Sequence, residues 1–577
     1  MLSNSAAAGA FAACYVLILF LQLNPRLPLD PVALAPLAMT TGLFYAVHLT
    51  AVFYVILVAR QLLARELFSP AWISIAVLAW LGAVASGAGA ALMWANLRTF
   101  STVLEPETAR ALAIAAPSLA VSAALFGIVG LARRRAGRQR RAVWATLLVF
   151  IAGGSIAAPL VARGGGRTPP LEARPLDTAL DTPLWDRASR VTIIAVDAGS
   201  LELVTKAAAQ GRLPNFGRIL DAGAVMHLAT LHPTSAEAVW TAVATGKLPQ
   251  QNGVRSARLY RSARGGDPIR LLPDYCYASG LIRFGLLTEE PYTSATVRTR
   301  TLWSILGTFG VPVGVINWPL TYPAPVVRGY VVSDVYARLA LTTSGLDDPS
   351  MLYPPDLHDD ALPIMQASAF DAGPVHPAGT NVVGRHQLPG RTDRAHDRLA
   401  QRLAAGRPTQ VTIVRYESLD SIGHYFLRYA VPSQFGDVTE EERRRYGAVL
   451  ESHYALIDEA IGRAIASLGP DDLLLVVSGY GMEPLGLAKR VLERVIGDPE
   501  VSGSHEGAPD GFLMAYGALV AKAGLVRRAS VVDVVPTVLY FLGLPVGRDM
   551  DGYTRTDLFQ PAFTADRPIT FIPTYER

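Results

Sequence analysis

The stretch Val191-Thr-Ile-Ile-Ala-Val196, followed directly by Asp197, decides the fold of the larger part of this chain. Its unbroken run of apolar and β-branched residues predicts a strand that is buried on both faces, as in a parallel sheet. Similar runs recur at Val311–Ile316, Val411–Val414 and Leu473–Val477, with helical stretches between them. This alternation predicts an α/β domain with a mostly parallel central sheet.

Polar residues stand directly after these runs, where open α/β folds gather their functional side chains. Asp197 follows the first strand, Asp420 and His424 follow the third, and Gly479-Tyr480 follows the fourth. If the chain turns helical after the third strand, Asp420 and His424 project from one face, as residues i and i+4 do. Taken alone, an Asp-x-x-x-His pair is in most cases a helix N-cap and an ordinary packed histidine.

The first part of the chain has a different character, because it consists of apolar segments. Charged residues make up 17% of the whole chain and hydrophobic residues 51%, which points to a membrane protein. Each apolar segment has about the 20 residues that a helix needs to cross a bilayer. We therefore expect an α-helical transmembrane bundle over residues 1–162, with about five spans. The segments run roughly Ala6–Leu23, Leu37–Val58, Trp72–Ala95, Ala111–Ala132 and Ala142–Ala162.

Arginines in the short loops predict how the bundle is oriented. Arg60 and Arg65 lie between the second and third segments, and a dense arginine run, Arg133–Arg141, lies between the fourth and fifth. The positive-inside rule places both loops in the cytoplasm. We therefore expect a multi-pass protein of the inner (plasma) membrane with its C-terminal domain outside the cytoplasm. An RNA-binding tract is the rival interpretation of the run, but flanking spans favour topology, so we expect no nucleic-acid partner.

Between the apolar segments and the first strand, the composition changes to glycine and proline. Gly164-Gly165-Gly166 and Pro169-Pro170 begin this stretch, which is typical of a linker that leaves the membrane. We therefore expect three parts: the bundle, a linker over residues 163–190, and an extracytoplasmic domain over residues 191–577.

Seven short motifs follow one another along the larger domain. They are Ile194–Asp197, Leu213–Phe216, Pro233–Pro249, Leu419–His424, Val476–Met482, Gly503–Gly511 and Val532–Thr537. In this order they resemble the type I phosphodiesterase and nucleotide pyrophosphatase branch of the alkaline phosphatase superfamily. The resemblance implies an alkaline-phosphatase-like α/β fold and a metal-dependent phosphodiesterase or phosphohydrolase that acts on a phosphate ester.

The resemblance also implies a set of metal ligands. One divalent metal of the family is held by an Asp-x-x-x-His pair and a later His, and the matching positions are Asp420, His424 and His505. Zinc suits such nitrogen and carboxylate ligands. The second metal is held by a first Asp, matched by Asp197, by the nucleophile and by an adjacent Asp-His pair. This chain has Gly479-Tyr480 in place of that pair, so we expect only one tightly bound metal.

The position of the nucleophile is irregular. The family places Thr, Ser or Cys nine residues before the Thr of a Thr-Gly pair, and counting back from Thr245 reaches Ala236. The nearest hydroxyls belong to Ser235 and Thr234, and either is a candidate for the catalytic nucleophile. The alternative is a capping box formed by Thr234 and Glu237 at the start of a helix. Both interpretations stay open, because a helix N-terminus also attracts phosphate.

Three functions are compatible with these features. The first is an extracytoplasmic phosphodiesterase or related phosphohydrolase. The second is a transferase that moves a phospho-substituent between lipids or envelope glycans, which the combination of five spans and an external domain suggests and which implies a lipid-linked substrate. The third is a catalytically impaired family member that binds a phosphorylated ligand or a partner protein, which Gly479-Tyr480 and Ala236 favour. Metal content and the turnover of a simple phosphodiester distinguish them.

Overall fold

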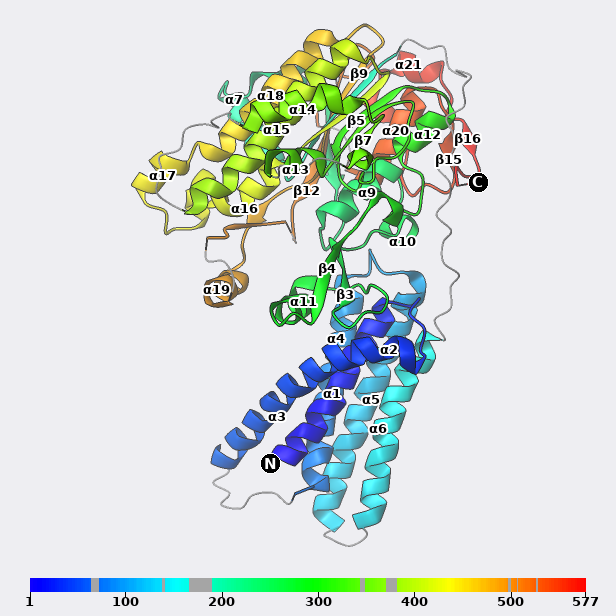
Figure 1. The fold of residues 1–577 in the computed structure, drawn as a ribbon, viewed down its shortest axis with the longest axis vertical. Helices are drawn as coiled ribbons and strands as arrows, with labels where there is room; N and C mark the ends of the chain where they lie inside the picture. The colour runs from blue at the N-terminus through cyan, green and yellow to red at the C-terminus, as the bar shows by residue number, and fades with distance from the viewer. Residues whose placement is uncertain are drawn as a thin grey trace. The chain divides into compact units, whose positions relative to one another are not determined.

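The computed structural model of the chain is shown in Figure 1. The residues it describes form two compact units. The helical unit contains the N-terminal helices together with Ser256–Tyr292, and the sheet unit contains the other described residues. Most of the expected linker, residues 165–188, lies outside the described residues. The structure describes residues 1–63, 72–136, 141–164, 189–342, 348–369, 381–496, 500–505, 507–522, 524–525 and 528–576.

The helical unit supplies five helices, among the described residues, that are long and apolar enough to cross a membrane. The second of them passes from α2 through a π-helical turn at Ala38–Gly42 into α3. Each of the five predicted apolar segments is thus helical. α1 has 67% of its most apolar window buried, compared with 17% for α6, so α1 is the most enclosed. The helices are α1 (Leu2–Leu23), α2 (Pro31–Leu37), α3 (Leu43–Leu63), α4 (Ile75–Thr99), α5 (Pro106–Ala136) and α6 (Arg141–Arg163).

Polar side chains connect α1 to its neighbours inside this unit. The Tyr15 hydroxyl lies 2.8 Å from the hydroxyl of Ser86 on α4 and 2.8 Å from that of Ser155 on α6. The Gln22 side-chain amide donates to the Pro159 carbonyl at 2.7 Å. Such bonds fix how the helices are rotated against one another, since apolar packing alone leaves rotation loosely specified.

The segment Ser256–Tyr292 packs with the helical unit although it lies between elements of the sheet unit in sequence. It contains the antiparallel strands β3 (Arg258–Ser262) and β4 (Leu287–Pro291) and the helix α11 (Asp274–Arg283). Its apolar side chains share a buried cluster with α1, and the Asn24 side chain exchanges hydrogen bonds of 2.8 and 2.7 Å with the backbone of Arg270. This segment was expected within the 191–577 domain, and no pattern in the sequence indicates this packing.

The sheet unit is built on one large sheet. Across the described residues it has ten strands in the order β13-β2-β12-β9-β1-β8-β5-β6-β7, with β14 also paired to β2. Strands β9, β1, β8, β5 and β6 are parallel neighbours, whereas β12 runs antiparallel to β9 and β2. The predicted α/β fold with a mostly parallel sheet is confirmed. The strands are β1 (Val191–Val196), β2 (Ala224–Ala229), β5 (Val313–Trp318), β6 (Gly329–Ser333), β7 (Leu352–Tyr353), β8 (Val411–Tyr416), β9 (Leu473–Tyr480), β12 (Asp510–Tyr516), β13 (Gly524–Leu525) and β14 (Ala529–Ser530).

Helices cover both faces of this sheet, which explains why its central strands are apolar throughout. All eight residues of β9 are buried. Figure 1 shows α15, α16 and α18 on one side of the sheet and α9, α12 and α20 on the other. The main covering helices are α7 (Leu201–Ala209), α8 (Pro214–Ala222), α9 (Ala236–Thr245), α12 (Leu302–Thr308), α14 (Leu357–Ala369), α15 (Asn381–Gly406), α16 (Ser418–Ala430), α18 (Val449–Ser467) and α20 (Val534–Phe541).

The carboxyl ends of the parallel strands meet at one edge of the sheet. The backbone is strained there, because Ala198 and Asn317 have φ angles of +50° and +60°, which residues other than glycine rarely adopt. Such strain is tolerated where the surrounding structure holds it, and it occurs most often at functional sites. Asp197 directly precedes Ala198, so we expect the functional site at this edge of the sheet.

Candidate active site

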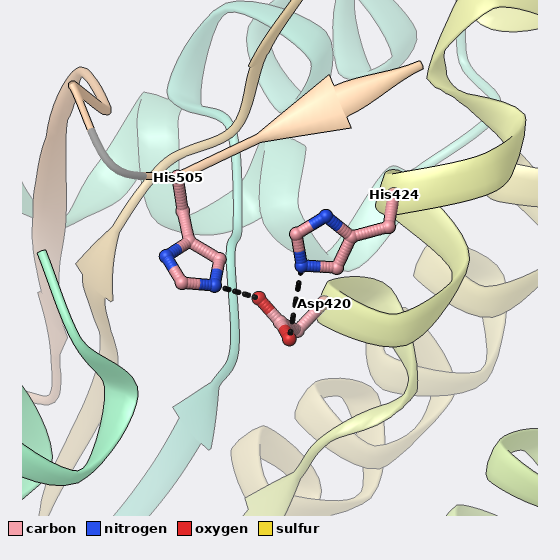
Figure 2. A group of neighbouring side chains, drawn as sticks. All are labelled: Asp420, His424 and His505. Carbon is pink, nitrogen blue, oxygen red and sulfur yellow. Dashed lines mark ion pairs between the residues drawn. The ribbon is translucent and has the colours of Figure 1, made fainter. Parts of the chain in front are cut away.

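Three side chains with metal-binding chemistry come together at this edge (Figure 2). In the described part of the chain, Asp420, His424 and His505 each offer one ligand atom, and these atoms lie within 4.8 Å of one another. Asp420 Oδ2 lies 3.8 Å from His424 Nε2, and Asp420 Oδ1 lies 3.6 Å from His505 Nε2. All three side chains are partly exposed, so an ion can reach them from solvent.

Two elements position these side chains. Asp420 and His424 are one turn apart on α16, which follows β8, and the carboxylate and the imidazole therefore share one helix face. His505 follows the short strand β11 (Gly503–Ser504). The Gly503 carbonyl lies 2.9 Å from His424 Nδ1, which places the proton on Nδ1 and leaves the Nε2 lone pair facing Asp420. This hydrogen bond joins the two segments that carry the histidines.

The geometry fits a divalent metal ion. In a tetrahedral zinc site with bonds of about 2.0–2.2 Å, neighbouring ligand atoms lie about 3.3–3.5 Å apart. The separations of 3.6 and 3.8 Å from Asp420 are slightly wider, and all three ligand atoms lie within 4.8 Å of one another, so side-chain movements would be needed to close the set around one ion. Two imidazole nitrogens and one carboxylate leave a fourth position open for substrate, which is the pattern of catalytic zinc.

Asp197 lies beside this group but is engaged by a cation of the protein itself. It is 1% exposed at the end of β1, and the guanidinium of Arg415 on the neighbouring strand β8 holds both of its carboxylate oxygens. Arg415 Nη1 also donates to the Asn317 carbonyl at 3.2 Å and to Glu417 at 3.3 Å. Burial raises the pKa of Asp197 to about 6, while the adjacent guanidinium acts to lower it.

Tyr480 occupies the end of β9 and is fully buried. Its hydroxyl donates a long hydrogen bond of 3.5 Å to Asp420 Oδ1, and its ring centroid lies 5.2 Å from that of His505. Burial raises the pKa of Tyr480 well above its usual value, so the phenol stays neutral and acts as a donor. Tyr480 therefore supports two of the three candidate ligands rather than replacing one.

Gly479 precedes Tyr480 at a place without room for a larger residue. A Cβ atom added to Gly479 would lie 2.5 Å from Val239 Cγ1 on α9, which is closer than real Cβ contacts. A β-branched valine buried in a helix cannot readily rotate away. A carboxylate at this position, which the resemblance implies for a second metal, does not fit this arrangement.

The two candidate nucleophiles lie at the start of α9 in different environments. Ser235 is the N-cap residue, and its hydroxyl donates to Glu237 Oε2 at 2.9 Å. Thr234 is buried, and its hydroxyl donates to the Leu231 carbonyl at 2.8 Å. The alternative capping box of Thr234 and Glu237 is wrong, because the helix begins at Ala236 and the cap position falls one residue later than that pattern requires.

Glu237 gives the Ser235 hydroxyl a base. Burial raises the pKa of Glu237, and hydrogen bonds from the backbone and from Ser235 act against this rise. The charges of Arg415 and Asp420 also act on Glu237, which places it in the same electrostatic environment as the metal ligands. A carboxylate with a raised pKa that accepts from a hydroxyl is the arrangement of a general base beside a nucleophile.

Comparisons with known proteins identify the family of the sheet unit. Residues 191–522 match the family described as type I phosphodiesterase / nucleotide pyrophosphatase. The chain belongs to this family. Two solved structures of murine ectonucleotide pyrophosphatase / phosphodiesterase 5 are similar, each covering 64% of this chain and 100% of its own, with a TM-score of 0.36. One is 13% identical, and the other, an inactive form in complex with AMP, is 12% identical. No curated protein sequence matches the chain.

Membership of the type I phosphodiesterase family makes this a phosphodiesterase/pyrophosphatase-like hydrolase domain, and the family is metal-dependent. The structure places the predicted Asp420, His424 and His505 together, with Asp197 outside this group. It also places the predicted Ser235 beside Glu237.

Arg415 is the residue of the site that the sequence analysis missed. The signal was available, since Arg415 follows the apolar run Val411–Val414 directly and lies within a central strand. A charged residue in a strand that is buried on both faces needs a partner of opposite charge. That requirement points to a carboxylate on a neighbouring strand, and Asp197 meets it.

Proposed function

We propose that this protein is a membrane-anchored, zinc-dependent phosphodiesterase that acts outside the cytoplasm on a phosphate-ester substrate. The convergence of Asp420, His424 and His505 on one open position carries the proposal, because family membership alone does not establish a working site. The Ser235 hydroxyl with its adjacent base Glu237, on which the charge of Asp420 acts, favours a hydrolase over a binding protein.

The metal would be held by Asp420, His424 and His505, and when bound it supplies positive charge to a phosphoryl oxygen of the substrate. Ser235 Oγ attacks phosphorus, and the bond to the leaving alkoxide breaks while Glu237 takes the Ser235 proton. The alkoxide takes a proton from solvent. The amides in the first turn of α9 would bind the phosphoryl group, as the N-terminus of a helix does.

The second half of the reaction reverses these changes. The oxygen of a water molecule bonds to phosphorus and releases a proton to solvent, while Ser235 Oγ leaves and regains the proton held by Glu237. Thr234 serves less well as the nucleophile, because its hydroxyl is buried and donates to a backbone carbonyl.

Membrane anchoring is supported by the five apolar helices, and the arginine-rich loops support an N-terminus inside the cytoplasm with the sheet unit outside. Protease added outside spheroplasts should digest the sheet unit and spare the helical unit. Protection of the sheet unit until the inner membrane is lysed would reverse the orientation.

A transferase that uses a lipid-linked substrate is the second candidate function. The five apolar helices favour it, because a chain anchored in the membrane can meet a substrate that is carried by a lipid. Release of a diacylglycerol or transfer of its phospho-substituent to an acceptor would support this candidate over simple hydrolysis.

The test uses the full chain purified in nanodiscs, with bis(p-nitrophenyl) phosphate, a phosphomonoester and phospholipid as substrates. We expect zinc-dependent turnover of a diester that is lost in His424→Ala. His227→Ala is the matched control, because His227 is an exposed histidine on β2 and should keep full activity. If the unmutated protein turns over none of the three substrate classes, a phosphate-binding protein becomes the better assignment.

A further inference from the structure

The Asp197 carboxylate is already hydrogen-bonded to the protein, and this pairing is incompatible with its binding a second metal ion. Both of its oxygens receive N–H donors from Arg415. The neighbouring position at Gly479 is closed by Val239, and the Tyr480 hydroxyl donates to Asp420. These residues do not fit a second divalent ion, because the carboxylate lone pairs that would bind it already accept hydrogen bonds.

We propose that the Arg415 guanidinium is the second cation of this site, so that the protein uses one metal ion and one arginine. The catalytic part of this inference rests on the proposed function, whereas the number of metal ions does not. Arg415 acts as a positioning residue, since its donors are directed to Asp197, Asn317 and Glu417 rather than to the open metal position.

The charges around Arg415 explain what it contributes. Asp197 and Glu417 are in contact with the guanidinium, and the charges of Asp420 and Glu237 also act within this buried group. Without a cation, these carboxylates would repel an anionic phosphodiester from the adjacent site. Arginine suits the task because its planar fork matches a carboxylate bidentately and stays charged when buried.

Metal counting tests the proposal without any substrate. Purified full-length protein, equilibrated with excess zinc and desalted, should contain one equivalent. Arg415→Ala removes the cation and leaves a cavity lined by carboxylates, and we expect it to hold two equivalents. Arg415→Ala combined with Asp197→Asn should return to one. Two equivalents in the unmutated protein, or one in folded Arg415→Ala, would overturn the proposal.

Turnover gives the second readout. We expect the kcat of Arg415→Ala to fall about 10–100-fold, as when a residue that supports a metal ligand is removed, with KM nearly unchanged. Millimolar methylguanidinium should raise the kcat of Arg415→Ala about 10-fold, because it fills the vacated space with the same cation. Arg190→Ala, which removes an arginine from the other end of β1, should show neither the loss nor the rescue. A loss that methylguanidinium cannot restore would count against the proposal.

Arg415→Lys keeps the inference testable if Arg415→Ala does not fold. A lysine retains the charge without the fork, so the variant should still bind one zinc equivalent, with a kcat reduced about 10-fold. Two equivalents in Arg415→Lys would contradict the proposal. If the unmutated protein turns over no diester, the proposed function fails while the metal counts still decide the role of Arg415.

Discussion

The two ends of strand β1 carry the same kind of ion pair in different surroundings. At the amino end, the Arg190 guanidinium lies 2.6 Å from Asp472, and their side chains are 54% and 6% exposed, so the arginine faces solvent. At the carboxyl end, Arg415 pairs with Asp197, and their side chains are 10% and 2% exposed. An ion pair with a solvent-exposed partner contributes little to stability. A fully buried pair is costly to desolvate and is retained where its charge contributes to function.

The partners at each end show the difference in use. Asp472 also accepts backbone N–H groups of Arg190 and Gly469, so it fastens the turns that enter β1 and β9. Arg415 contacts Asp197 and Glu417, which neighbour the candidate metal ligands. The Arg190–Asp472 pair therefore fixes the turns at the amino end of the sheet, whereas the Arg415–Asp197 pair sets the charge beside the candidate metal ligands.

The largest expected effect on activity concerns the two hydroxyl-bearing residues that precede α9. Ser235→Ala should lower kcat at least about 10³-fold, because it removes the attacking atom. Thr234→Ala should lower kcat less than about 10-fold, since its hydroxyl only donates to Leu231. Steady-state kinetics on a simple diester measures both. Equal activity in both variants and the unmutated protein would point instead to attack by water.

Removing the arginine from each end compares the two pairs directly. Arg415→Ala leaves Asp197 buried without its partner and should lower the free energy of unfolding by about 3–5 kcal/mol. Arg190→Ala breaks a half-exposed pair and should cost about 1 kcal/mol or less. Tryptophan fluorescence during chemical unfolding in detergent gives both values. Similar losses in the two variants would remove the distinction between the two ends.

The two ends should also respond to pH in opposite directions. Near the site, Asp393 on α15 accepts the backbone N–H groups of Glu417 and Ser418, and burial, followed by the charge of Glu417, raises its pKa to about 7. The folded state therefore holds a proton that the unfolded chain has lost, and stability falls by up to about 4 kcal/mol as pH rises from about 4 to 7. In Asp393→Asn this slope should be reduced.

Asp472 provides the contrast, because its pKa is lowered. Burial acts against its ionised form, but hydrogen bonds from Arg190 and the backbone outweigh burial. Its contribution to stability is present above its unfolded pKa and is lost as pH falls through its folded pKa. Melting temperatures of Asp472→Asn and Asp393→Asn between pH 3 and 8 separate the two effects. An unchanged slope in Asp393→Asn would disprove its assigned role.

Tyr480→Phe is expected to have the smallest effect. It removes only the long hydrogen bond to Asp420 and keeps the ring beside His505. Zinc affinity should fall about 10-fold, as for other residues that orient a metal ligand, with stability nearly unchanged. Competition with a zinc-binding dye measures this shift. Tyr516→Phe, a partly buried tyrosine at the far end of β12, is the control and should leave zinc affinity unchanged.

Much of this arrangement follows from short patterns in the sequence. Buried runs predict parallel strands, and polar residues after them fall at one edge because parallel strands end together. Asp420 and His424 gain their common face from helical spacing alone, and His505 was found only through the family resemblance.

The remaining features depend on contacts between distant segments. The pairing of Arg415 with Asp197 requires the register that sets Ala195 beside Arg415, and no local pattern fixes that register. The packing of Ser256–Tyr292 with the helical unit also escaped prediction, because apolar residues such as Leu271 look the same whichever core they enter. The start of α9 differed by one residue, which changed the partner of Glu237 from Thr234 to Ser235.

An anomalous diffraction map of the zinc-loaded full-length protein tests the central claim most directly. We expect one zinc peak, bounded by Asp420, His424 and His505, with the Arg415 guanidinium still paired to Asp197. Two zinc peaks with Asp197 as a ligand and Arg415 displaced, or no peak among the three side chains, would contradict it.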